Sequence, residues 1–413
     1  MLDIAAICLV VTALFTYLNH RFVRLPTTIG VMAIALGISL AMIGLDRLGL
    51  DHGLRRYEAS FLRSIDFSDV LMQGMLSFLL FAGALHVDLR ALRSYRWQVA
   101  SLALAGTLFS TLVVGLGMWA LLPLVGIQLA LLPCLLFGAL ISPTDPIAVM
   151  GILRSAGAPK NLELVIAGES LFNDGVGVVV FALLLGVWTS GTTPTPAAAG
   201  WLLLREAGGG VAFGLALGYV TFRLLRSIDQ YQIEVLLTLA AVMGGYALAS
   251  HLHVSGPLAM VVCGLMIGNG GRALAMSDHT RRYIDMFWEL IDEILNAVLF
   301  VLIGLEVLLI TFTGSILTAG AIAIMVTLAA RWITVGIPVF AASNFFSLPQ
   351  GSPRVLAWGG LRGGISVALA LSLPLGADRE VILALTYCVV VFSILVQGLT
   401  VGRVVQSAIG IDK

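Results

Sequence analysis

Long apolar runs separated by short polar connections fill almost the whole chain. A helix needs roughly 20 mostly apolar residues to cross a bilayer, with some latitude for tilt. Runs of that kind lie at 4–19, 27–45, 69–88, 98–122, 127–152, 161–188, 203–225, 231–251, 254–270, 283–310, 314–342, 355–374 and 381–402. The pattern predicts an all-α integral membrane protein with about 13 transmembrane helices.

Two of these runs are interrupted near their middle. The fifth contains Ser-Pro-Thr-Asp-Pro at 142–146, and the twelfth contains Gly-Gly-Leu-Arg-Gly-Gly at 359–364. Both sequences open a helix at membrane depth. Broken helices at corresponding positions of two halves are typical of transporters built from inverted repeats. We therefore expect a single domain over 1–413, with a first six-helix repeat over about 1–188, a linker helix over about 200–226 and a second repeat over about 231–407.

The composition supports a membrane protein. Of 413 residues, 59% are hydrophobic and 11% are charged, and the mean hydropathy is +1.02. A water-soluble globule cannot bury that much apolar surface. The formal net charge is zero, so no basic excess indicates a nucleic-acid partner. No cytosolic regulatory or nucleotide-binding domain is expected, and no Walker-type loop suggests ATP-driven pumping.

The positive charges predict the orientation, because cytoplasmic loops are enriched in Lys and Arg. Alternate loops, counted from the first, hold Arg21, Arg24, Arg90, Arg93, Arg96, Arg154, Lys160, Arg223, Arg226, Arg272, Arg281, Arg282, Arg354, Arg403 and Lys413. The opposite loops hold Arg47, Arg55, Arg56, Arg63, Arg205 and Arg379. We therefore expect a multi-pass protein of the cell membrane with its N-terminus outside and its C-terminus in the cytoplasm.

Polar and acidic residues that can bind an ion or a proton gather on the fifth and sixth spans. Thr144 and Asp145 lie at the first break, where unwound backbone exposes carbonyl groups and a half-helix end. The sixth span carries Glu169, Ser170, Asn173 and Asp174. At 100° per residue, Glu169 and Asn173 share one helix face and Ser170 and Asp174 share another.

Carboxylate, hydroxyl and carbonyl oxygens suit both a hard cation such as Na⁺ and a proton. Burial disfavours a charged carboxylate, so proton and cation compete for one site, and that competition couples their transport. We predict that Asp174 is this carboxylate. Glu169 is equally compatible with a structural role as an ion-pair partner, because the buried charges of Arg331 and Arg362 need partners. Arg331 is the candidate partner of Glu169, and Arg362 is expected to neutralise exposed half-helix ends or Asp145.

The two interrupted sequences, together with Glu-Ser-Leu-Phe-Asn-Asp at 169–174, resemble the monovalent cation:proton antiporter-1 family of NhaP-like Na⁺/H⁺ antiporters. The resemblance covers essentially the whole transmembrane chain. It implies a homodimer with a dimerisation part, a mobile core part and crossing broken helices beside the ion.

Carried over by motif, the resemblance makes Asp174 the ion and proton site, with Ser170, Glu169 and the Thr144 backbone as further Na⁺ ligands. Asp145 would be linked to the ion through water. Asn173 resembles the electroneutral branch, since electrogenic relatives have Asp there. The resemblance implies that Arg331 faces the glutamate and that Arg362 lies at the second helix crossing.

The expected function is secondary active exchange of Na⁺ or Li⁺ for H⁺, with no enzymatic activity and no cofactor beyond the transported ions. Exchange of K⁺ for H⁺ is the alternative on the same scaffold, because oxygen ligands alone do not fix cavity size. A cation channel or a transport-dead receptor fits the pattern less well. The acidic residues of the tenth span, Glu289, Asp292, Glu293 and Glu306, are expected at solvated helix ends or in a funnel that attracts cations.

Overall fold

The computed structural model describes residues 2–47, 75–145, 147–191, 200–202, 204–271, 276–309 and 313–409. Over these residues it contains helices and no strand. The α-helices are α1 (Leu2–Leu18), α2 (Thr27–Arg47), α5 (Leu76–Leu85), α6 (Leu89–Arg93), α7 (Arg96–Ala100), α8 (Thr107–Leu121), α9 (Leu131–Ile141), α10 (Ile147–Ser155), α11 (Lys160–Ser190), α13 (Gly209–Leu225), α14 (Tyr231–His251), α15 (Gly256–Met266), α17 (Asp278–Glu306), α18 (Gly314–Arg331), α19 (Ile337–Ala341), α20 (Ser343–Phe346), α21 (Ser352–Trp358), α22 (Gly364–Leu371), α23 (Ala377–Phe392) and α24 (Gly398–Ile409). Short π-helical turns extend several of them, including η3 (Ser101–Gly106), η5 (Leu204–Gly208), η6 (Ile267–Gly271), η8 (Trp332–Gly336) and η9 (Ser393–Gln397).

Helical segments occupy every predicted span, although residues 69–74 of the third lie outside the described part of the chain. Within that part, 8 helical stretches are long and apolar enough to cross a membrane, and three shorter apolar helices accompany them. The all-α membrane architecture is therefore confirmed. Helix α17 is long enough but carries several carboxylates, which lower its hydropathy. The division into repeats at about 188 and 231 stays a prediction.

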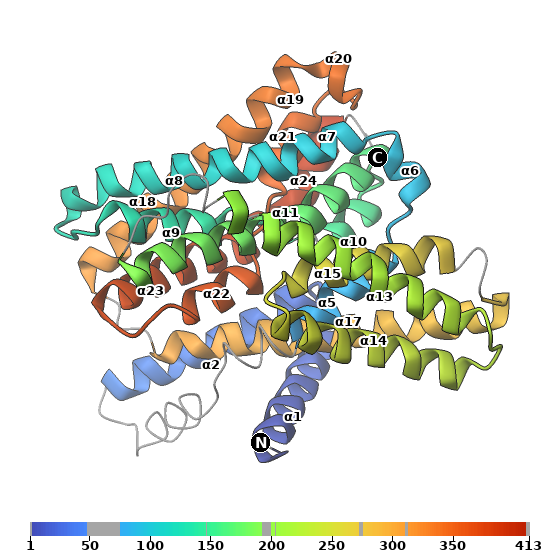
Figure 1. The fold of residues 1–413 in the computed structure, drawn as a ribbon. Coiled ribbons are helices and arrows are strands. Elements are labelled where there is room, and N and C mark those ends of the chain that lie inside the picture. Colours follow the sequence, from blue (N-terminus) through green and yellow to red (C-terminus); the bar gives the residue numbers. More distant parts are fainter. Residues whose placement is uncertain are drawn as a thin grey trace.

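Most helices gather in two bundles (Figure 1). The site bundle consists of α8, α9, α11, α18, α22 and α23, and the flanking bundle consists of α5, α13, α14, α15 and α17. The broadest helix contacts lie within them, such as α8 on α9 and α13 on α15. Helix α2 packs along α17, and α5 packs along α15. Since lipid is as apolar as these side chains, close van der Waals packing and buried polar contacts hold such bundles together.

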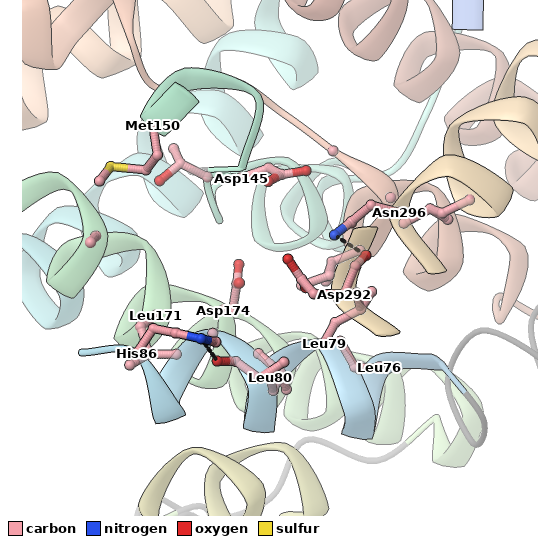
Figure 2. A pocket seen from close by; sticks show the side chains of 18 of the residues that line it. Leu76, Leu79, Leu80, His86, Asp145, Met150, Leu171, Asp174, Asp292 and Asn296 are labelled. Atoms are coloured by element: carbon pink, nitrogen blue, oxygen red, sulfur yellow. Dashed lines mark hydrogen bonds between the residues drawn. The ribbon is translucent and has the colours of Figure 1, made fainter. Parts of the chain in front are cut away.

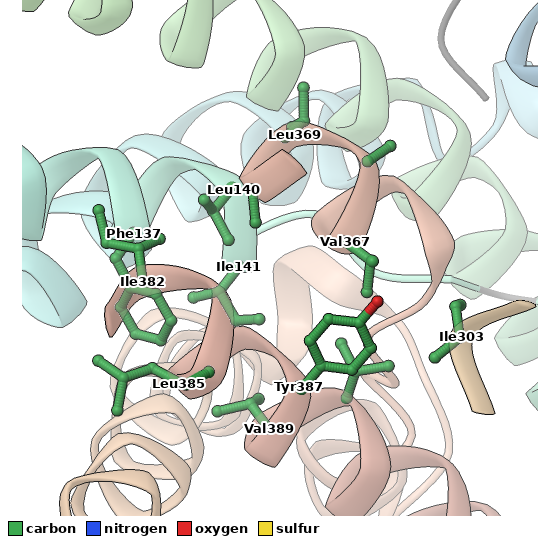
Figure 3. Packing of buried hydrophobic residues seen from close by; sticks show 14 of the residues in the cluster. Phe137, Leu140, Ile141, Ile303, Val367, Leu369, Ile382, Leu385, Tyr387 and Val389 are labelled. Atoms are coloured by element: carbon green, nitrogen blue, oxygen red, sulfur yellow. The ribbon is translucent and has the colours of Figure 1, made fainter. Parts of the chain in front are cut away.

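The largest apolar cluster connects the site bundle to α17 (Figure 3). The cluster includes Phe137 and Ile141 of α9, Val367 of α22, Tyr387 of α23 and Ile303 of α17. Each of these side chains is almost completely buried. The cluster packs the interrupted helices α9 and α22 side by side, and this packing positions their breaks.

Candidate ion-binding site

The two helix breaks meet in the centre of the molecule. Helix α9 ends at Ile141 and α10 begins at Ile147, while α21 ends at Trp358 and α22 begins at Gly364. The backbone N–H of Asp145, in the first break, donates to the carbonyl of Leu361, in the second, over 2.8 Å. Pro146 of the first motif lies outside the described residues. The breaks thus satisfy part of each other's exposed backbone, which a membrane interior requires.

Arg362 holds the crossing together. Its guanidinium Nη1 donates to the carbonyl of Ser142 and, over 2.9 Å, to that of Pro143. These carbonyls belong to the C-terminal end of α9, which carries partial negative charge. The Arg362 side chain is buried, and its backbone N–H donates to Ser393 Oγ over 2.8 Å. Of the two predicted partners for Arg362, the half-helix end is the one it contacts through hydrogen bonds.

Glycine is required next to Arg362. A Cβ atom on Gly363 would overlap the carboxylate of Asp145. Any other residue would therefore displace the Asp145 side chain or push the two breaks apart. The glycine allows the side chain of one interrupted helix to lie directly against the backbone of the other.

Thr144 connects the first break to α11. Its backbone N–H donates to Asn173 Oδ1 over 3.2 Å, and its hydroxyl accepts from Asn173 Nδ2 over 2.9 Å. The same hydroxyl lies 3.0 Å from Ser170 Oγ. All three residues are buried. Ser170 and Asn173 therefore fix the unwound backbone at Thr144, in place of the helical hydrogen bonds that it lacks.

Glu169 and Arg331 form a buried bidentate ion pair between α11 and α18. Nη1 of Arg331 donates to Oε1 of Glu169, and Nη2 donates to Oε2 over 2.9 Å. Arg331 Nε also donates to the carbonyl of Leu356 over 3.2 Å. The pairing predicted from the sequence is present. Both carboxylate oxygens of Glu169 are engaged by the guanidinium, so this residue faces an arginine and not the open cavity.

Asp174 lines a cavity of about 440 Å³ between the two bundles. Figure 2 shows Asp174 and Asp145 on one side of this cavity and Asp292 of α17 on the other. Asp174 is 7% exposed and, among the described residues, forms no hydrogen bond or ion pair. The further polar lining is contributed by Thr144, His86, Arg154, Glu289, Glu293, Asn296 and Ser366. A buried carboxylate beside a polar cavity can bind a proton or a cation from it.

Comparison with known proteins identifies the family. A family model described as sodium/hydrogen exchanger, transmembrane, matches residues 10–407. The chain belongs to this family of sodium/hydrogen exchangers.

Relatives agree over nearly the full length. The chain is 57% identical over 410 residues to the Na⁺/H⁺ antiporter NhaP of Pseudomonas aeruginosa, a match covering 98% of this chain and 96% of the relative. It is 36% identical over 382 residues to the Na⁺/H⁺ antiporter NhaH of Halobacillus dabanensis, covering 91% of each. Its fold is similar to that of the sodium proton antiporter MjNhaP1 from Methanocaldococcus jannaschii at pH 8, with a TM-score of 0.71, 20% identity and coverage of 93% and 99%.

One sequence-based expectation is wrong, and one contact was not foreseen. Helical spacing places Asn173 on the face of Glu169, but Asn173 contacts Thr144 together with Ser170. Thr144 lies between the two helix faces, so Ser170 and Asn173, which are three residues apart, can both reach it. Glu306 was expected at a solvated helix end, but it is 6% exposed. Tyr387 of α23, which is itself buried, lies against it.

The other acidic residues of α17 lie where the funnel prediction placed them. Glu289, Asp292 and Glu293 line the cavity of the exchanger. His86 lies on the same cavity, and its Nδ1 is 2.8 Å from the carbonyl of Ala82.

Two residues of the crossing were not predicted from the sequence. Ser393 accepts the Arg362 backbone N–H, and Gln397 Nε2 donates to the Trp358 carbonyl over 2.9 Å. Both residues lie in η9, within an apolar span. The only signal for them was a hydroxyl and an amide in such a span, where an unpaired polar group is costly. Their partners lie on a different helix and cannot be located from spacing.

Proposed function

We propose that the protein is a secondary active antiporter that exchanges Na⁺ or Li⁺ for H⁺, with both ions competing for Asp174. The observation that carries this proposal is the position of Asp174 at the crossing, buried and without an ion pair among the described residues. Relatives sharing nearly the full length are named Na⁺/H⁺ antiporters. A carboxylate that no arginine holds must be neutralised by a proton or by a cation, and this alternation is the exchange.

The Na⁺ ligands are the carboxylate of Asp174 and the hydroxyl and backbone oxygens of Thr144 and Ser170. Thr144 lines the cavity, and its hydroxyl lies beside that of Ser170. Asp145 lines the same cavity and reaches the ion through water. Glu169 acts as a positioning residue, because Arg331 engages both of its oxygens. No cofactor is needed beyond the transported ions.

Exchange is electroneutral. Asn173 occupies the position before Asp174, and both ends of its amide are bonded to Thr144. An uncharged side chain there leaves one titrating carboxylate in α11 at the crossing, because Glu169 is paired with Arg331. One proton then replaces one monovalent cation, with no net charge moved.

Transport proceeds by movement of the site bundle against the flanking bundle. The cavity is lined from both sides, by α5 and α17 and by α10, α11 and α22. His86 and Arg154 lie on it near loops that the positive charges place in the cytoplasm. We therefore propose a cytoplasm-facing state of a plasma-membrane protein whose N-terminus is outside. Two copies associate through their flanking bundles, which stay fixed while the site bundles move.

Reconstituted vesicles with an imposed pH gradient test the function. Adding Na⁺ or Li⁺ should dissipate the gradient, whereas a response to K⁺ alone would contradict the sodium assignment. Asp174→Asn should reduce exchange at least about a hundredfold, since the competing charge is gone. Glu289→Gln, which changes another carboxylate of the same cavity, should retain exchange. Clamping the membrane voltage tests electroneutrality, and a rate that depends on voltage would contradict the role given to Asn173.

A further inference from the structure

A second cavity, of about 480 Å³, lies outside the ion site. It is formed by the short helices α6 and α7, which connect α5 of the flanking bundle to η3 and α8, and by α20. Its lining consists of Arg90, Arg93, Ser94, Arg96, Trp97 and Gln98, with Phe345 opposite. Gln98 Nε2 donates to the carbonyl of Phe345 over 2.7 Å and thereby joins the two walls.

The positive charges of this cavity have no anionic partner in the described part of the chain. Arg90, Arg93 and Arg96 are exposed, and none forms an ion pair within the described ranges. The neighbouring carboxylate of Asp88 accepts the backbone N–H groups of Arg90 and Ala91, as the N-cap of α6. Arg96 lies 5.8 Å from the centre of the Trp97 ring. Three guanidinium groups around one cavity favour an anion that accepts several hydrogen bonds, such as a phosphate group.

The cavity lies at the level of the membrane surface. Arg96 begins the apolar helical stretch Arg96–Val125, which is long enough to span a bilayer. Trp97 is 66% exposed at the same end, and tryptophan favours the headgroup region. We propose that Arg90, Arg93 and Arg96 bind the phosphate of an anionic phospholipid in the cytoplasmic leaflet. The positive-inside rule accounts for arginines in this loop, but not for their convergence with an exposed tryptophan on one cavity.

The opposite face of α6 and α7 touches the helix that carries the ion site. A Cβ atom on Gly168 of α11 would meet the side chains of Leu92 and Val99. Gly168 directly precedes Glu169. Asn269 fixes the other end of α6, because its side chain accepts from Leu89 N and donates to the carbonyl of Val87. A bound phospholipid therefore braces α6 and α7 against α11, beside the Glu169–Arg331 pair.

Binding is measured first, in detergent, as the rise in Tm of the full chain on adding phosphatidylglycerol. The rise should be large for the unmodified protein and small with phosphatidylcholine. Each arginine beside an anionic headgroup contributes roughly fivefold in affinity, so Arg90→Gln/Arg93→Gln/Arg96→Gln should weaken binding on the order of a hundredfold. The control Arg223→Gln/Arg226→Gln/Arg403→Gln removes the same amount of positive charge. These three arginines are also exposed, and the positive-inside rule places them in the cytoplasm as well. The control should bind as the unmodified protein does.

Three results would overturn the lipid site. They are an unchanged Tm rise in the triple variant, an equal loss in the control, or an equal rise with inorganic phosphate, which would indicate a site for free anions. Should the triple variant not fold, the single variants Arg90→Gln and Arg93→Gln replace it, each with an expected loss of about fivefold.

A second measurement tests the effect on transport and rests on the proposed function. Exchange is compared in vesicles of phosphatidylcholine alone and of phosphatidylcholine with phosphatidylglycerol at three parts to one. Phosphatidylglycerol should accelerate exchange by the unmodified protein and by the control, but not by the triple variant. Equal acceleration of all three would refute the bracing of α11. Because the Tm measurement needs no transport, a failure of the antiport assignment would leave the binding result standing.

Discussion

Replacing Arg331 by methionine tests how the ion pair supports the site. The variant Arg331→Met removes both hydrogen bonds to Glu169 and the bond from Nε to the Leu356 carbonyl. Glu169 is 1% exposed, so its carboxylate would stay buried with no partner. The companion variant Glu169→Gln leaves the guanidinium of Arg331 buried without its carboxylate partner. The double variant removes both charges and keeps side chains of similar length.

The expected loss in the free energy of unfolding is the sum of two contributions. Leaving one charge of a buried pair uncompensated costs about 3–5 kcal/mol, and losing a backbone-directed hydrogen bond costs about 1 kcal/mol more. At the lower end of that range, Arg331→Met should lose about 4 kcal/mol and Glu169→Gln about 3 kcal/mol, a sum of about 7 kcal/mol. The double variant carries no buried charge at this position. It should lose only about 3 kcal/mol, about 1 for the hydrogen bond to the Leu356 carbonyl and about 2 for the unpaired amide of the new glutamine.

Denaturant unfolding in mixed micelles, followed by tryptophan fluorescence, measures these differences. The control is the ion pair of exposed Arg154 with partly buried Glu163, with an N–O distance of 3.8 Å and side-chain exposures of 71% and 19%. Arg154→Met should cost less than about 1 kcal/mol. If the double variant loses as much as the two single variants together, the pair contributes no coupling and the reasoning is refuted.

Three further predictions concern the crossing and its carboxylate. Asn173→Asp should make exchange voltage-dependent in vesicles of defined membrane potential, because it adds a titrating charge; unchanged electroneutral exchange would contradict this. Gly363→Ala should reduce exchange at least about tenfold, because its methyl group overlaps Asp145, whereas Gly376→Ala, where a Cβ atom would meet nothing, should leave the rate unchanged. The apparent KM for Na⁺ should rise about tenfold for each pH unit below the range in which Asp174 is deprotonated. An apparent KM independent of pH in flux measurements would exclude competition at one carboxylate.

Much of the fold follows from the sequence, because length and hydropathy alone identify membrane spans. The two breaks were also predictable, since proline and clustered glycine disfavour a continuous helix. The pairing of Glu169 with Arg331 followed from charge balance, as a buried arginine needs an anion. Each of these predictions depends on a single span or on the cost of burying a charge.

The errors arise where two distant spans must be placed relative to each other. Helical spacing gives directions around one axis, but it does not say that Thr144 lies where both Ser170 and Asn173 reach it. Likewise, Glu306 follows the last apolar turn of α17, and the sequence does not show that Tyr387, on another helix, covers it. In both cases the decisive contact joins residues of different helices.

The two buried arginines explain why Asp174 is left uncommitted. Arg331 is engaged by Glu169 and by the Leu356 carbonyl, and Arg362 by two carbonyls at the end of α9. Broken helices make the second arrangement possible, because they expose carbonyl groups that can neutralise part of a guanidinium charge without a carboxylate. An unbroken α9 would leave Arg362 without these acceptors, and its charge would then need a buried carboxylate such as Asp174. Because such a pair would exclude both proton and Na⁺, the break supports the proposed role of Asp174 by keeping the arginine occupied elsewhere.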